Sequence, residues 1–113
     1  MGVSEQDAAD QDMAVDKGVF PWAASGRALG MGRDEGMTKL LFDQETGRLV
    51  GAGIVGPHAG DLISEAMLGV EMGTDAADIA LTVHPHPTIS ETVAFAAEMV
   101  EGSITDLLPP RRR

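Results

Sequence analysis

Two His-Pro dipeptides, His84-Pro85 and His86-Pro87, constrain the fold of this chain more than any other feature. Proline fixes its own φ angle, lacks a backbone N–H and disfavours helical geometry in the residue before it. The two dipeptides therefore forbid a continuous helix, and they predict a stiff connector between two helices that holds both imidazoles. Connectors of this kind on a packed scaffold often carry functional side chains.

The apolar pattern on either side of the connector predicts the fold class. Apolar residues alternate in segments before residue 56 and recur at helical spacing after residue 61. Strands that precede helices in this way indicate an α+β domain, in which an antiparallel β-sheet packs against helices. We expect a short helix that starts near Ser4, an edge strand at 15–24, a glycine-punctuated loop at 26–36, strands at 38–42 and 49–55 around a hairpin turn, and helices near 62–72, 74–83 and 88–100.

Length and composition limit the function further. The 113 residues support one domain, expected at 1–108, followed by a disordered basic tail at 109–113. The absence of cysteine excludes disulfides, thiolate metal sites and a cysteine nucleophile within the chain, and it fits a reducing, cytoplasmic compartment. The net charge of −10 disfavours nucleic acid and suits a basic partner protein, and no apolar run is long enough to span a membrane.

Gly51, Gly53 and Gly56 have the spacing of a dinucleotide-binding loop. Such a loop must follow a strand, open a helix and belong to a βαβ unit. Here the glycines lie in the second strand of a hairpin, and Pro57 interrupts the chain before any helix begins. We therefore expect them to mark close packing by a neighbouring segment rather than a nucleotide site.

The three histidines, His58, His84 and His86, are potential metal ligands, because imidazole suits zinc, copper and iron. Their spacing gives no helical i, i+4 pair. On an extended connector His84 and His86 would project to opposite sides. We therefore expect no metal site.

Glu91 has two alternative roles. In a capping box, Thr88 would cap the following helix and Glu91 would accept from the backbone N–H of Thr88. Alternatively, Glu91 accepts a hydrogen bond from His86, as when a third group holds a base for proton transfer. The spacing favours the cap, and it leaves His86 open between an acid–base group and an ordinary packed histidine.

The octapeptide His84-Pro85-His86-Pro87-Thr88-Ile89-Ser90-Glu91 resembles the C-terminal signature of dihydrolipoyl dehydrogenase. Four further segments occur in the family's order, at 20–28, 51–57, 62–66 and 101–107. The resemblance covers nearly the whole chain. It indicates the interface, or dimerisation, domain of this flavin-dependent family of pyridine nucleotide-disulfide oxidoreductases.

The resemblance implies a homodimer in which each copy supplies His86 to the active site of the other, beside a redox disulfide and the flavin. His86 would act as the acid–base residue, and Glu91 would orient it and stabilise its charged form. The backbone of His86 and Pro87 would lie near the partner's flavin. The bond between these two residues is similar to one that is cis in these enzymes.

In the complete enzyme, the resemblance implies FAD, NAD and the oxidation of dihydrolipoyl-lysine on the lipoyl-bearing acyltransferase of a 2-oxoacid dehydrogenase complex. This chain departs from that pattern, because it has no redox cysteine pair and no flavin- or nicotinamide-binding fold. We therefore expect it to bind neither cofactor alone and to be inactive alone. The family's usual first strand is absent, so we also expect an N-terminally truncated domain with an open sheet edge.

Two other interpretations stay open. One is a non-catalytic module that dimerises and docks onto a basic subunit-binding domain, which the negative net charge motivates. The other is the interface domain of a related disulfide reductase, such as glutathione or mercuric reductase, although the double His-Pro motif and segment 103–106 favour the lipoyl branch. In all of these interpretations we expect His84 to be structural.

Overall fold

Three antiparallel strands form the centre of the fold in the computed structural model, which describes residues 1–33 and 35–102. β1 (Val15–Pro21), β2 (Met37–Asp43) and β3 (Leu49–Val55) lie in the order β1-β2-β3. A tight turn joins β2 to β3, and Gly47 takes a φ of 74° there, which glycine adopts without steric cost. The predicted hairpin and the edge position of β1 are confirmed.

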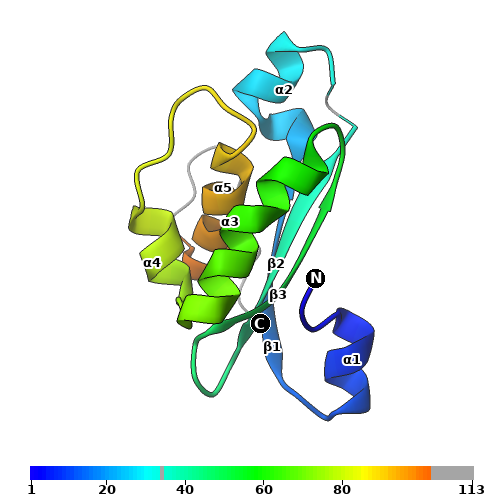
Figure 1. Cartoon of the computed structure of the whole chain (residues 1–113), viewed down its shortest axis with the longest axis vertical. Coiled ribbons are helices and arrows are strands. Elements are labelled where there is room, and N and C mark those ends of the chain that lie inside the picture. Colours follow the sequence, from blue (N-terminus) through cyan, green and yellow to red (C-terminus); the bar gives the residue numbers. More distant parts are fainter. Residues whose placement is uncertain (34, 103–113) are drawn as a thin grey trace.

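Helices cover both faces of this sheet. The helical segments are α1 (Glu5–Asp10), the 3-10 turn η1 (Trp22–Ala24), α2 (Gly26–Gly30), α3 (Ala59–Met72), α4 (Ala76–Leu81) and α5 (Glu91–Glu101). Figure 1 shows α3, α4 and α5 on one side of the sheet and α1 on the other. Within the helical layer α4 contacts α5, while α5 contacts β1 and β2, and α3 contacts β3. The predicted α+β architecture is confirmed.

The main core lies between the sheet and the helical layer. The rings of Phe20 and Phe95 pack with their centroids 4.8 Å apart. β1 approaches α5 closely at Gly18, where a Cβ atom would lie 2.0 Å from the carbonyl oxygen of Ala96. This approach therefore depends on the absence of a side chain at residue 18. The other buried core side chains include Leu40, Phe42, Leu49, Ala66, Val93 and Ala97.

A buried hydrogen-bond chain joins the sheet to the start of α5. The indole Nε1–H of Trp22 donates to Oγ1 of Thr38 at 3.0 Å, and the hydroxyls of Thr38 and Thr92 lie 2.8 Å apart. Oγ1 of Thr92 lies 2.7 Å from the carbonyl oxygen of Ile89. Because an indole only donates and a carbonyl only accepts, Thr38 donates to Thr92, and Thr92 donates to Ile89.

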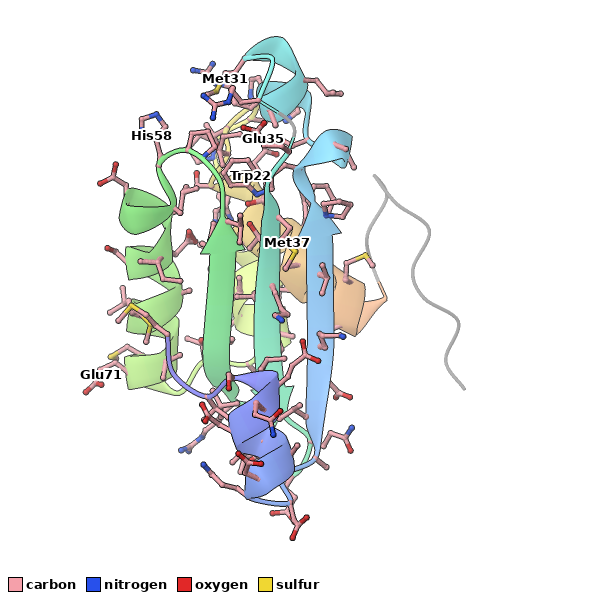
Figure 2. The ribbon with its side chains drawn as sticks, turned by 90° about the vertical axis from the view of Figure 1, so that its right-hand side faces the viewer. Trp22, Met31, Glu35, Met37, His58 and Glu71 are labelled. Atoms are coloured by element: carbon pink, nitrogen blue, oxygen red, sulfur yellow. The ribbon has the colours of Figure 1, made fainter. Side chains whose placement is uncertain are left out.

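Ion pairs fix α1 to the opposite face of the sheet, the face turned towards the viewer in Figure 2. Glu5 accepts from Nζ of Lys39 at 2.6 Å and from Nζ of Lys17 at 3.3 Å. These hydrogen bonds, chiefly the one from Lys39, hold the pKa of Glu5 below its usual value. Ser4 and Asp7 form a capping box at the start of α1, where we expected a short helix to begin.

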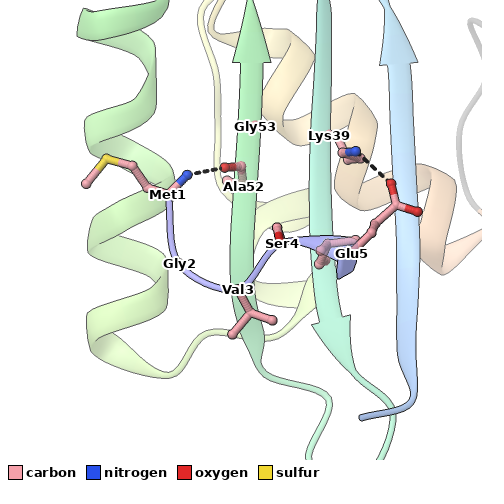
Figure 3. Close-up of a pocket in the computed structure, with 9 residues that line it drawn as sticks. Met1, Gly2, Val3, Ser4, Glu5, Lys39, Ala52 and Gly53 are labelled. Atoms are coloured by element: carbon pink, nitrogen blue, oxygen red, sulfur yellow. Dashed lines mark hydrogen bonds and ion pairs between the residues drawn. The ribbon is translucent and has the colours of Figure 1, made fainter. Parts of the chain in front are cut away.

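The first residues of the chain cover part of the sheet edge that we expected to be open. The ammonium group of Met1 donates to the carbonyl oxygen of Ala52 at 2.6 Å, and the N–H of Ala52 donates to the carbonyl oxygen of Met1 at 2.9 Å. The N–H of Val3 donates to the carbonyl oxygen of Val50 at 2.9 Å. Figure 3 shows this segment beside β3, where it borders a pocket of about 260 Å³.

Two predicted boundaries in the first half are wrong. The strand expected at 15–24 ends at Pro21, after which Trp22 turns into the core as the first residue of η1. The expected loop at 26–36 contains α2, because the buried hydroxyl of Ser25 accepts from the N–H of Ala28 at 3.2 Å and so acts as an N-cap.

A third boundary, that of α4, also differs. The C-terminal stop of α3 at Gly73 is as predicted, since Gly73 has a φ of 67°. Asp75, rather than Thr74, caps α4, because Asp75 and Asp78 form a reciprocal capping box. α4 ends at Leu81, two residues earlier than expected. No helix within 1–33 and 35–102 is long and apolar enough to cross a membrane, and the predicted tail at 109–113 and most of segment 101–107 lie outside the described residues.

Candidate active site

The predicted stiff connector runs through residues 82–90 between α4 and α5. It begins at Thr82, whose backbone is extended and whose hydroxyl donates to a carbonyl oxygen of α4 at 2.7 Å. At its other end Ile89 is buried. The peptide bond between His86 and Pro87 is cis, in agreement with the resemblance. The connector is thus fixed at both ends and carries two histidines between them.

His86 faces Glu91, the first residue of α5. Nδ1 of His86 lies 3.0 Å from Oε1 and 3.1 Å from Oε2 of Glu91. Because a carboxylate accepts, the contact selects the tautomer with its proton on Nδ1. The side chain of His86 is 77% exposed, and that of Glu91 is 12% exposed. Among the described residues Nε2 of His86 has no hydrogen-bond partner, so the ring is held on one side and open on the other.

The same carboxylate also closes the start of α5. Oε1 of Glu91 accepts from the backbone N–H of Thr88 at 2.9 Å, which is one half of the predicted capping box. Among the described residues the other half, a hydrogen bond from the N–H of Glu91 to Oγ1 of Thr88, is not formed, and Oγ1 of Thr88 donates to the carbonyl oxygen of Pro85 at 2.6 Å. α5 accordingly begins at Glu91 after the N-cap residue Ser90, rather than near Thr88. The two alternative roles of Glu91 occur together in this structure.

His84 points away from this pair and into the protein. Its side chain is 7% exposed. Nδ1 lies 2.8 Å from the carbonyl oxygen of Thr82, and Nε2 contacts the carboxylate of Glu65 in the middle of α3. Sequence reasoning missed Glu65 as a partner, because 19 positions separate the two residues. The one feature of the sequence that could have pointed to Glu65 is its position between apolar residues of the helix that became α3.

The third histidine lies elsewhere. His58 precedes α3 in the left-handed region with a φ of 63°, and its exposed ring lies 3.8 Å from the carboxylate of Asp61. Figure 2 shows it at the far end of the sheet from α1. Within the part of the chain that the structure describes, no group of three or more His, Cys, Asp or Glu residues is arranged to hold a metal ion.

The glycine-rich segment in β3 has a packing role at two of its three glycines. A Cβ atom at Gly51 would lie 1.9 Å from the carbonyl oxygen of Val3, and one at Gly56 would lie 2.4 Å from the indole ring of Trp22. A Cβ atom at Gly53 would meet nothing within 4 Å. The segment therefore accommodates a backbone and a side chain of this chain, as expected from its place in a hairpin.

Four large apolar side chains on α3, at the end of α4 and in the connector are exposed. They are 63% to 93% exposed, and we call them the α3–α4 patch: Leu68, Met72, Leu81 and Val83. Leu68 and Met72 line a groove of about 230 Å³ between α3 and α4, together with Thr82 at the start of the connector. Exposed apolar residues grouped in this way mark interaction surfaces.

The fold and the connector define a recognisable class of domain. Residues 1–97 match the family described as pyridine nucleotide-disulphide oxidoreductase, dimerisation domain. The chain belongs to this family.

Among curated proteins the chain is similar to dihydrolipoyl dehydrogenases. It is 52% identical over 107 residues to the enzyme of Vibrio parahaemolyticus, which covers 95% of this chain and 22% of that protein. It is 49% identical over 108 residues to the enzyme of Buchnera aphidicola from Schizaphis graminum, covering 96% of this chain and 23% of that protein. The resemblance noted in the sequence is confirmed, and the chain spans less than a quarter of these relatives.

Solved structures agree on the fold. The HOCl-induced flavoprotein disulfide reductase RclA from Escherichia coli, solved as a Cu(II) complex, matches with a TM-score of 0.82. The match covers 88% of this chain and 22% of that chain at 23% sequence identity. At this identity the match supports the fold alone.

Proposed function

We propose that this chain is the dimerisation domain of a dihydrolipoyl dehydrogenase and that it supplies His86 and Glu91 as an acid–base pair to the active site of a second copy. The observation that carries the proposal is the asymmetric pair itself. Glu91 is nearly buried and doubly hydrogen-bonded, while the ring that it holds is largely exposed with Nε2 open. A base held by a third group and presented to the outside is the arrangement that proton transfer requires.

In this reaction His86 acts through Nε2. It takes the proton from one thiol of a dihydrolipoyl group as the resulting thiolate attacks a disulfide, which another part of the complete enzyme would supply because this chain has no cysteine. Protonation gives His86 a positive charge, and the Glu91 carboxylate at 3.0 Å stabilises that charge. The hydrogen bond from Thr88 to Glu91 keeps the carboxylate in place while the ring changes its charge. When the second sulfur of the dihydrolipoyl group closes the lipoyl disulfide, the mixed disulfide breaks and His86 gives the proton to the cysteine sulfur that is displaced.

The described residues offer no site for a dinucleotide at the glycine-rich segment, because Val3 and Trp22 fill the space beside Gly51 and Gly56. They fit instead a surface that borders a cofactor held by another part of the enzyme, with His86 and Pro87 exposed at the tip of the connector. In the complete enzyme FAD and NAD would take up the two electrons released when the dithiol is oxidised. The proposed role of this chain in the reaction is to bind the second copy and to transfer the proton.

The α3–α4 patch supports the dimerisation part of the proposal. Its four apolar side chains lie on α3, at the end of α4 and at the start of the connector. A second copy that covers them would remove this apolar surface from water. Val83 lies in the connector three residues before His86, so a second copy that covers Val83 would come close to the acid–base pair.

A chimera tests the proposal. In it this chain replaces the matching 107-residue segment of the Vibrio parahaemolyticus enzyme, and turnover is measured as NAD reduction by dihydrolipoamide. We expect the chimera to dimerise and turn over, and His86→Asn to lower kcat about 10²- to 10⁴-fold. Asparagine can still donate to Glu91 from the position of Nδ1, but it cannot carry the proton.

His58→Asn is the matched control, since it changes an exposed histidine outside the connector. It should keep the turnover of the parent chimera. A chimera that dimerises with bound flavin but does not turn over would contradict the proposal.

The second candidate function is a non-catalytic dimerisation and docking module, for which the α3–α4 patch is the supporting observation. It predicts that His86→Asn leaves both turnover and the dimer intact. The wider assignments, namely a lipoyl-bearing acyltransferase as partner and a cytoplasmic location, belong to the first proposal and are tested by pull-down with that subunit and by cell fractionation.

A further inference from the structure

The connector that carries His86 is attached to α3 by a part-buried side-chain pair. His84 lies two residues before His86, and its ring spans from the carbonyl oxygen of Thr82 to the carboxylate of Glu65. Glu65 belongs to the helix that also carries Leu68 and Met72 of the α3–α4 patch. The proposed contact surface and the proposed acid–base residue are therefore joined through one pair of side chains.

The two ring nitrogens of His84 have different partners. The carbonyl oxygen of Thr82 only accepts, so Nδ1 of His84 carries a proton. Nε2 faces a carboxylate, which also accepts when it is ionised. Both ring nitrogens therefore face oxygen atoms, that of Thr82 on one side and those of Glu65 on the other. A contact between an imidazole and a carboxylate, with the ring 7% exposed, holds the connector against α3 more firmly than a neutral contact at the surface does.

The rest of the connector adds a second attachment on the far side of His86. Oγ1 of Thr88 donates to the carbonyl oxygen of Pro85, and the N–H of Thr88 donates to Glu91. His86 thus lies between an attachment to α3 through His84 and an attachment to α5 through Thr88. The second attachment uses Glu91 itself, whereas the first is independent of it.

We infer that His84 and Glu65 form a positioning pair, which fixes the connector relative to α3 and thereby keeps Nδ1 of His86 on Glu91. The pair acts through His86 and takes no proton from the substrate. The inference rests on the proposed function for the importance of His86, but its own content is the geometry of the connector.

The test is a long-range ¹H–¹⁵N NMR spectrum of the histidine rings of the 113-residue chain, which reports the tautomer of each neutral imidazole. We expect the wild-type chain at about pH 8.5, roughly two pH units above the free imidazole pKa, to show His86 in the Nδ1–H form. Glu65→Ala should release the connector, and the two ¹⁵N signals of His86 should then move towards each other as both tautomers become populated.

Three further variants sharpen the result. Glu65→Gln should restore the wild-type signals, because its side-chain amide can donate a hydrogen bond to Nε2 of His84. His84→Asn keeps a donor for Thr82 but loses the contact with Glu65, so it should repeat the effect of Glu65→Ala. Glu71→Ala is the matched control, because it removes an exposed carboxylate from the same helix (Figure 2), and it should leave His86 unchanged.

Circular dichroism and the methyl spectrum of the core establish that each variant is folded. A folded Glu65→Ala or His84→Asn chain that retains the wild-type tautomer of His86 would overturn the inference, as would a change of the same size in Glu71→Ala. Loss of the fold in either disruptive variant would also overturn it, since the pair would then be part of the core. None of these measurements depends on turnover, so failure of the His86→Asn chimera test would leave this result standing.

Discussion

The backbone N–H of Thr88 donates to the same oxygen of Glu91, at 2.9 Å, that lies 3.0 Å from Nδ1 of His86. One carboxylate oxygen therefore serves the helix and the histidine together. It can do so because a carboxylate offers about four acceptor sites on its two oxygens.

Replacing Glu91 should affect stability and chemistry together. Glu91→Ala leaves the N–H of Thr88 without its acceptor and should lower the free energy of unfolding by about 1–2 kcal/mol, as the loss of a helix cap does. In the chimera it should also lower kcat, because His86 loses the carboxylate that stabilises its charge. Urea unfolding and turnover measure the two effects. Thr88→Ala, which keeps its N–H on Glu91, should lower stability but retain most of kcat; equal losses of kcat in both variants would contradict the assignment.

The α3–α4 patch makes a prediction about association. Leu68→Glu places a charge among exposed apolar side chains, and a charge is costly to bury without a partner. We expect this variant to weaken the dimer of the chimera at least tenfold in sedimentation velocity, while its fold is retained. Leu29→Glu, on an exposed leucine of α2, is the control and should dimerise normally. If Leu29→Glu weakens the dimer and Leu68→Glu does not, the contact surface is not on α3.

The buried threonine pair makes a prediction about stability. Thr92→Val removes the acceptor of the Thr38 hydroxyl and the donor to Ile89. A buried polar group left unpaired costs about 1–3 kcal/mol, and about 1 kcal/mol corresponds to roughly 4–8 °C in Tm for a domain of this size. Differential scanning calorimetry measures the change. Thr92→Ser retains the hydroxyl and should lose less; a Thr92→Val chain as stable as wild type would show that the chain of hydrogen bonds contributes little.

Glu5 makes a prediction about pH. Its pKa is lowered in the folded state by hydrogen bonds from Lys39 and then Lys17, so its contribution is present above the ordinary glutamate pKa of about 4.3. That contribution is lost as pH falls through the lower, folded pKa. Glu5→Gln should therefore lose less Tm than wild type between pH 7 and pH 3. Glu45→Gln, which makes the same charge change on the hairpin turn, should follow wild type; an equal effect in both variants would assign the pH dependence to net charge.

Local rules explain which features could be predicted from sequence. The prolines predicted the connector and Gly73 predicted the end of α3, because each of these residues restricts the backbone at its own position. The start of α4 was misplaced by one residue, since Thr74 and Asp75 are both good caps and only Asp75 has an acid three positions on. Such competition between neighbours is decided by a few tenths of a kcal/mol to about 1 kcal/mol.

The contacts that sequence reasoning missed join distant residues. Glu65 meets His84 only because α3 packs beside the connector, and Thr38 meets Thr92 across 54 positions. Neither pair has a spacing rule of its own. The same holds for the N-terminal residues on β3, which pair with the sheet through backbone groups that carry no side-chain signal.

The indole ring of Trp22 lies against Gly56, where a Cβ atom would come within 2.4 Å of it, and against Gly36, where the distance would be 2.6 Å. The three positions therefore share one volume. A smaller residue at 22 would not free these positions, because a Cβ atom at Gly36 would also lie 2.3 Å from the carbonyl oxygen of Val55, and Gly56 has a φ of 140°. The final glycine of the apparent nucleotide motif is therefore required by its own backbone conformation as well as by the tryptophan beside it.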